Sequence, residues 1–200
     1  MRADSWASLA GAALCALLIA ADAAAAHNPK APDPKAIVLP ISDVPAGLTV
    51  SSQGYESLTE AAAGGPFTAA QYKAWGYLSG YEVHYELAGS AAKVVTGPVL
   101  ITSSASVYKT PAGAAASLAA SRAQCPKNGG HSFSPGGRIG DQSFGCVVNV
   151  TENGVPLVDY VVGWHRGPVK EGIVLGGTPT GASAAQTVRL ARLVDKRIPG

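Results

Sequence analysis

The sequence predicts an α+β fold, with an antiparallel sheet of about five strands, two longer helices, one short helix and one disulfide. Three observations lead to this class. Several apolar segments alternate with period two and are joined by short turns, which is typical of antiparallel strands. Segments with helical spacing and capping residues stand between these groups. Two cysteines, Cys125 and Cys146, lie downstream of a leader that predicts export to an oxidising compartment.

The leader is residues 1–26, which have the order of a secretory signal peptide. Arg2 is followed by an apolar or small stretch from Trp6 to Ala21 and then by small residues. This stretch is shorter than the ~20 residues of a membrane-spanning helix, so we expect cleavage and no permanent transmembrane span. An A-x-A site ending at Ala26 is one cleavage point, and a site ending at Ala23 is the alternative.

Cys15 does not fit a lipoprotein signal. Leu14 precedes it rather than a small residue, and much of the apolar stretch follows it. We therefore expect a secreted or periplasmic protein without a lipid anchor at Cys15.

A proline-rich tether, residues 27–36, precedes a single predicted α+β domain at residues 37–200. The domain begins with IVLPISDVPAGLTVSS, where prolines and Gly47 predict a short edge strand or an irregular lead-in. The formal net charge is only +2 and the basic residues form no stripe with interleaved aromatics, so nucleic acid is not an expected partner.

The first helix is predicted over residues 68–76, because Thr68 and Gln71 form a capping-box pattern and Gly76 can end it. The strand YLSGYEVHYEL follows at residues 77–87. Its alternation places Tyr81 and Tyr85 with apolar neighbours, which predicts that both rings pack on the core and that His84 lies on the polar face.

The second half continues with a strand at residues 98–108 and a helix at residues 110–125, in which Thr110 is the N-cap and Pro111 the first helical residue. A Gly-rich loop follows. Within it, Gly140-Asp141 predicts a turn in which the Asp accepts backbone hydrogen bonds.

A hairpin is predicted in FGCVVNVTENGVPLVDYVVGWHR, with Asn153-Gly154 as its turn. This register pairs Cys146 with Val161 and Val148 with Asp159. Cys146 then shares a face with Val148, where the helix containing Cys125 should lie, so the hairpin and a Cys125–Cys146 disulfide support each other.

The chain ends with a strand at residues 172–177 and a helix at residues 183–198, whose Arg189, Arg192 and Lys196 should face solvent.

Motifs for chemistry are few. The four His lack metal-ligand spacing, so we expect no metal and no cofactor. Ser143 in GDQSFG lacks the glycine two residues earlier that a nucleophile elbow requires. Asp159 lies mid-strand among apolar residues, and a carboxylate there needs a partner or a raised pKa.

The segments SDVPAG, SGYEVHYE, VYKTPAGAAASLAASRA, IGDQSFG, VVGWHRG and LARLVDKRI resemble those of uncharacterised exported bacterial proteins. Their pattern is also similar to antiparallel α/β sandwiches of the PsbP/Mog1 type. That resemblance implies an accessory or binding module and supplies no catalytic residues.

We therefore expect an exported, non-catalytic domain that binds a small apolar ligand or an envelope protein. The expected contact residues are Trp75, Tyr77, Asp159, Trp164 and Arg138, beside the Gly-rich loop 127–142. The alternative is a hydrolase-type enzyme centred on Asp159, with His165 or His131 as acid–base partner.

Overall fold

A computed structural model describes residues 31–87, 97–152 and 154–199. Its centre is one antiparallel sheet of seven strands in the order β1-β2-β3-β7-β6-β5-β4. The strands are β1 (Leu48–Glu56), β2 (Tyr77–Leu87), β3 (Pro98–Tyr108), β4 (His131–Phe133), β5 (Gln142–Glu152), β6 (Val155–Arg166) and β7 (Val169–Gly177). The helices are α1 (Pro34–Ile37), the 3-10 turn η2 (Ile41–Asp43), α2 (Leu58–Gly64), α3 (Ala69–Trp75), α4 (Pro111–Lys127) and α5 (Ala184–Asp195).

The α+β class and the disulfide are confirmed, but the predicted number of elements was wrong. The sheet has seven strands rather than about five, and α1 and α2 join the three predicted helices. β1 begins inside the predicted lead-in, where a short edge strand was one of the two expectations, but it runs on to Glu56 and seven of its nine residues are exposed. β4 has three residues inside the Gly-rich loop and is defined by its pairing with β5.

The missed helices have local signals. Ser57 and Glu60 form a complete capping box at the start of α2. Asp33 caps α1, and Pro34 occupies its first turn with its side chain buried. The last three residues of the predicted tether therefore belong to this first helix.

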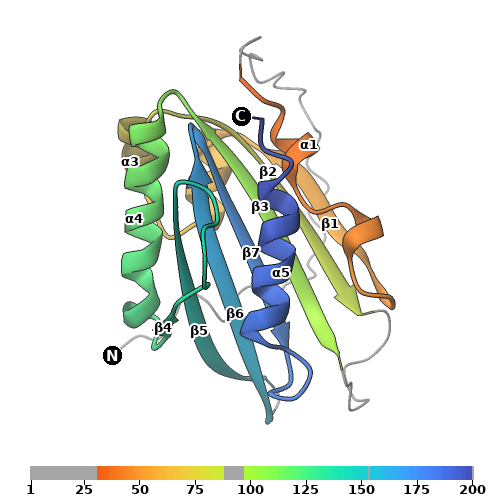
Figure 1. Cartoon of the computed structure of the whole chain (residues 1–200). Coiled ribbons are helices and arrows are strands. Elements are labelled where there is room, and N and C mark those ends of the chain that lie inside the picture. Colours follow the sequence, from red (N-terminus) through yellow and green to blue (C-terminus); the bar gives the residue numbers. More distant parts are fainter. Residues whose placement is uncertain (1–30, 88–96, 153, 200) are drawn as a thin grey trace.

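The helices cover both faces of the sheet (Figure 1). Along β6, Val161 packs with Leu118 of α4, whereas the next residue, Val162, packs with the residues of α5. Because successive side chains of a strand point to opposite faces, these contacts define an α4 face and an α5 face. The α2 and α3 helices lie on the α4 face, where they form an aromatic cluster with Tyr108 at the end of β3 and with Ala114 of α4.

The predicted hairpin register is confirmed, since Cys146 pairs with Val161 and Val148 with Asp159. Cys146 is bonded to Cys125 on α4, with an S–S distance of 2.04 Å and a Cα–Cα distance of 6.0 Å. The disulfide therefore links α4 to β5 on the face of the sheet where the sequence predicted α4 to lie.

The predicted caps are also confirmed. Thr68 and Gln71 cap α3, which ends at Gly76 with a φ of 76°, and Thr110 caps α4. α4 passes α3 closely at Gly113, where a Cβ atom would lie 1.9 Å from the carbonyl oxygen of Trp75. Only a residue without a side chain allows this approach.

In the described ranges, no helix has the length and apolar character needed to cross a membrane. The predicted signal peptide, its cleavage site, Cys15 and the first four residues of the predicted tether, 27–30, lie outside the described residues.

Candidate functional site

The aromatic residues singled out in the sequence lie in two different places. Trp75 and Tyr77 belong to the cluster on the α4 face, where Trp75 contacts Phe67 edge-to-face at 5.0 Å. Tyr77 is buried, and its hydroxyl donates to the carbonyl oxygen of Glu56 at 3.0 Å. Trp164 is fully buried in the core beneath α5. The sheet therefore separates Trp164 from Trp75, and the two do not line one ligand surface.

Asp159 is half-buried on the α4 face of β6. His165 lies six residues further along the same strand, which is about 20 Å at 3.3 Å per residue. His131 pairs with Val147, whose side chain joins the core of the α5 face. Neither histidine therefore meets Asp159, and the geometry required by the alternative hydrolase is not formed.

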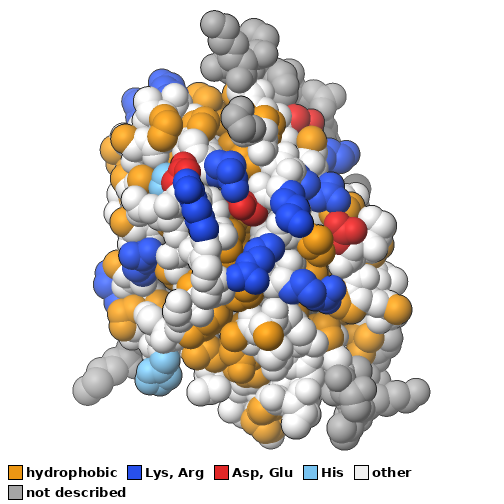
Figure 2. Space-filling model, in the orientation of Figure 1, with side chains coloured by type: hydrophobic (Ala, Val, Ile, Leu, Met, Phe, Trp, Pro, Cys, Tyr) orange, Lys and Arg blue, Asp and Glu red, His pale blue; other side chains and the backbone are white. Residues whose placement is uncertain are grey.

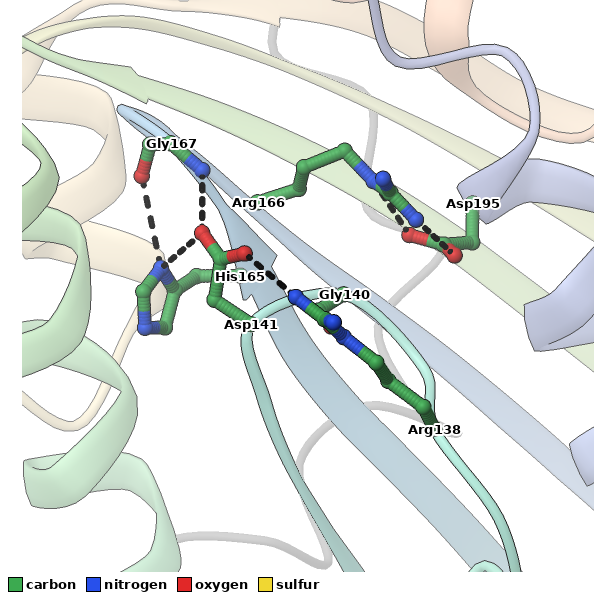
Figure 3. A network of polar contacts seen from close by, with 7 residues as sticks. All are labelled: Arg138, Gly140, Asp141, His165, Arg166, Gly167 and Asp195. Carbon is green, nitrogen blue, oxygen red and sulfur yellow. Dashed lines mark hydrogen bonds and ion pairs between the residues drawn. The ribbon is translucent and has the colours of Figure 1, made fainter. Parts of the chain in front are cut away.

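Arg138 is exposed in the Gly-rich loop and belongs to a network of polar contacts (Figure 3). Its Nε donates to the carbonyl oxygen of Gly140 at 3.0 Å, and its guanidinium lies 3.6 Å from Asp141. The Asp141 carboxylate accepts the Gly167 N–H at 2.8 Å, which is the main reason its pKa is lowered. The predicted role of Asp141 as an acceptor of backbone hydrogen bonds is confirmed.

The same network fastens α5 to the sheet. Arg166 of β6 donates through Nε to Asp195 Oδ1 at 3.0 Å and through its terminal nitrogen to Oδ2 at 2.5 Å (Figure 3). Asp195 is largely buried at the end of α5. This bidentate pair raises the pKa of Arg166, chiefly through the hydrogen bonds to Asp195.

Beneath α5, two buried polar side chains face each other across β6 and β7. Trp164 pairs with Glu171, and Glu171 is 1% exposed. Among the described residues, neither carboxyl oxygen of Glu171 nor the indole N–H of Trp164 has a hydrogen-bond partner. Burial raises the pKa of Glu171 well above its ordinary value, with a smaller contribution from the negative charge of Asp195.

The best candidate for a ligand site is an apolar cleft of about 460 Å³ on the α5 face, near the β1 edge of the sheet. Its floor is formed by Tyr81, Val83 and Tyr85 of β2. The chain following α1 makes one side, and β1 makes the other through Val50 and Gln53. A volume of this size lies within the range of small-molecule sites.

The cleft is held in shape by hydrogen bonds around its floor. The Tyr81 hydroxyl donates to Gln53 Oε1 at 2.9 Å, and the Tyr85 hydroxyl donates to the carbonyl oxygen of Leu39. The Leu39 N–H in turn donates to the buried Ser103 hydroxyl at 3.0 Å. Both tyrosines are buried, as the alternation predicted, and their polar ends are already satisfied by protein groups.

Two cations stand at the rim of the cleft. The Lys35 ammonium lies 5.7 Å from the centre of the Tyr81 ring, a cation–π contact. Arg197 also lines the cleft and pairs with Asp43 at 2.9 Å. The site thus combines an apolar floor with the Lys35 ammonium and the ion-paired Arg197 at its mouth, and it suits a ligand with an apolar body and an anionic group.

The positive rim continues onto the outer surface of α5. Arg189, Arg192 and Lys196 are exposed there, as the helical spacing predicted. Figure 2 shows Lys and Arg side chains gathered over this face of the molecule. This excess of positive charge would attract an anionic ligand toward the cleft.

The chain matches no protein-family model and no curated protein. Among solved structures, it is similar to the extracellular domain of PknH from Mycobacterium tuberculosis, with a TM-score of 0.49 and 10% sequence identity. The match covers 81% of this chain and 94% of that chain. A likeness at this level says nothing about function.

Proposed function

We propose that this protein is an exported, non-catalytic binding domain, and that its cleft holds a small ligand with an apolar body and an anionic group. The observation that supports this proposal is the cleft itself. Its buried floor of Tyr81, Val83 and Tyr85 would contact the apolar part, while Lys35 and Arg197 would attract the charge.

Export is supported by the leader of residues 1–26 and by the Cys125–Cys146 disulfide, since such bonds persist in oxidising compartments. A secreted or periplasmic location would give the domain access to ligands of the cell envelope.

Binding is favoured over catalysis because the polar groups at the floor are committed to the protein. The hydroxyls of Tyr81 and Tyr85 already donate to Gln53 and to the backbone of Leu39. A general acid or base must instead reach the reacting group of its substrate. The cleft therefore offers a surface of fixed shape.

The test uses 1-anilinonaphthalene-8-sulfonate, an aromatic anion, titrated into the mature, oxidised protein while fluorescence is recorded. Val50→Asp places a negative charge at the cleft and should weaken binding at least tenfold. Val155→Asp is the matched control, because Val50 is 43% exposed and Val155 is 44% exposed but lies away from the cleft. Equal affinities for the two variants would contradict the proposed site.

The charge at the rim is tested separately. Lys35→Gln should weaken binding of the anion and reduce its dependence on salt, whereas Lys73→Gln, on the exposed surface of α3, should change neither. An unchanged affinity for Lys35→Gln would remove the anionic group from the proposal. Native mass spectrometry of protein purified from an oxidising compartment would then identify a ligand retained from the host.

A further inference from the structure

β1 is the long edge of the sheet. In the described chain its one sheet neighbour is β2, and seven of its nine residues are exposed. The strand at the opposite edge, β4, has only three residues. An exposed edge presents backbone N–H and C=O groups to which another strand can pair.

Apart from one bulge near its start, this edge has little of the protection that natural sheets use. Its sequence, LTVSSQGYE, contains no lysine or proline, and its one charged residue is Glu56 at the end. The pairing with β2 is irregular between Val50 and Ser52, and this bulge leaves a regular segment from Ser52 to Glu56. The regular segment is long enough to receive a short extended peptide.

An acidic recess of about 200 Å³ opens beside that segment on the α4 face. Ser52, Gly54 and Glu56 line it from β1, and Glu82 and His84 line it from β2. A Cβ atom on Gly54 would meet nothing within 4 Å, so space is open directly above the strand. The recess is therefore both reachable and lined by two carboxylates.

The polar groups of the recess are ordered. Glu82 Oε1 lies 2.6 Å from His84 Nε2, and His84 Nδ1 lies 3.1 Å from the Thr102 hydroxyl. Glu56 is partly buried at the end of β1, close to Glu82. Glu82 forms an ion pair with His84, so Glu56 is the carboxyl of the recess with which an added basic side chain would pair. Burial raises the pKa of Glu56 to about 7, and a cation placed beside it would favour its charged form.

The two faces of β1 lead to two different environments. Val50 lines the apolar cleft on the α5 face, Gly54 lines the acidic recess on the α4 face, and Gln53 borders both. A strand added beside β1 would send alternate side chains to these two faces. Peptide recognition by strand addition works in this way, with backbone pairing for affinity and alternate side-chain sites for specificity.

We propose that β1 accepts an extended peptide segment of a partner protein as an eighth strand, and that this peptide alternates apolar residues with lysine or arginine. The basic side chains face the recess at Glu56 and Glu82, and the apolar ones face the mouth of the cleft. The apolar half of this recognition rests on the proposed function. The backbone pairing and the basic half do not depend on it.

The probe is the fluorescein-labelled peptide Thr-Val-Lys-Val-Lys-Val-Thr-amide. Its binding is measured by fluorescence polarisation and by the change in the amide chemical shifts of residues 52–56. Two further peptides are N-methylated at alternate positions, one on each edge of the peptide strand. Only the peptide methylated on the edge that faces β1 should lose binding. A peptide with Glu in place of Lys should bind at least tenfold more weakly.

Gly54→Arg tests the recess, because it places a like charge where the basic side chain would lie. Binding should fall at least tenfold, while Gly54→Ala should keep it. Gly64→Arg is the control for net charge, since a Cβ atom there also meets nothing within 4 Å. Circular dichroism and thermal unfolding establish that each variant is folded.

The outcomes separate this proposal from the proposed function. If neither methylation pattern nor Gly54→Arg changes peptide binding, or if the peptide does not bind, strand addition is refuted even where the aromatic anion still enters the cleft. If the peptide binds as expected but Val50→Asp leaves binding of the aromatic anion unchanged, the proposed cleft ligand is refuted and the strand addition stands.

Discussion

Replacing Glu171 should stabilise the protein at neutral pH. The carboxyl is 1% exposed beneath α5, opposite Trp164, and neither of its oxygens has a hydrogen-bond partner within the described residues. Leaving a buried polar group unpaired costs about 1–3 kcal/mol. Glu171→Leu removes the polar group while keeping a similar length, so its free energy of unfolding at pH 8 should exceed that of the wild type by at least that amount.

The same residue should make stability depend on pH. Burial raises the pKa of Glu171 in the folded state, so the folded protein holds a proton that the unfolded chain releases above its ordinary pKa. Stability is therefore highest below that ordinary pKa and falls as pH rises toward the folded value. The loss is about 1.4 kcal/mol for each pH unit inside this window. Glu171→Gln has no ionisable group at this position and should remove this part of the dependence.

The assay is urea unfolding of the mature, oxidised protein at pH 5, 6, 7 and 8, followed by far-UV circular dichroism. Glu56→Gln is measured in parallel, because burial also raises the pKa of Glu56, to about 7, and adds a slope of the same sign between about pH 4.5 and 7. A Glu171→Leu variant less stable than the wild type at pH 8 would refute the reasoning. It would mean that the carboxyl has a favourable interaction in the folded state.

Three further predictions concern stability. Replacing Cys125 and Cys146 by Ala should lower the free energy of unfolding by about 3 kcal/mol, because the disulfide closes a loop with a sequence separation of 21. Urea unfolding of the oxidised wild type and of the variant measures this difference, and a loss below about 1 kcal/mol would contradict the prediction. Gly113→Ala should lower the free energy of unfolding by about 1–3 kcal/mol, because the new methyl group would clash with the Trp75 carbonyl. Gly64→Ala, where the space is open, should be neutral or slightly stabilising. Thermal unfolding compares the two variants, and equal effects would argue against the close approach. Asp195→Asn should cost about 1.5–3 kcal/mol because it weakens the bidentate contact between a largely buried carboxylate and Arg166. Asp43→Asn, at the more exposed carboxylate that pairs with Arg197, should cost below about 1 kcal/mol. A reversed order in chemical denaturation would show that burial of the carboxylate does not set these strengths.

The parts of the fold that could be predicted from the sequence are those with strong local signals. The hairpin register followed from the Asn153-Gly154 turn and from apolar alternation, and the register in turn placed Cys146 beside α4. Thr68 and Thr110 marked the starts of α3 and α4. In each case the residues that give the signal also act in the folded structure. The apolar side chains of the hairpin pack on the core, and the capping threonines accept hydrogen bonds from backbone N–H groups at the helix starts.

β4 and the second half of β1 lack such signals, because their strand partners define them. β1 exposes most of its side chains, so only its pairing with β2 reveals it as a strand. The candidate site was missed for the same reason. Lys35 and Leu39 come from segments predicted to be a tether and a lead-in, and the cleft exists only because tertiary contacts place them against β2. Tyr81 and Tyr85 were correctly predicted as buried, but the alternation does not show that they also line a cleft.

The order of the strands bears on how the chain reaches this fold. β1, β2 and β3 are consecutive neighbours, and so are β4, β5, β6 and β7, whereas the pairing of β3 with β7 joins segments about 70 residues apart. The sheet therefore consists of two meanders of mostly local pairings and one non-local seam, whose closure carries the larger entropic cost. Cys125 and Cys146 both lie in the second half of the chain, on the same side of this seam. Oxidation of the thiols can thus precede closure of the seam, and the order in which an emerging chain acquires its covalent bond and its complete sheet is not fixed by the fold.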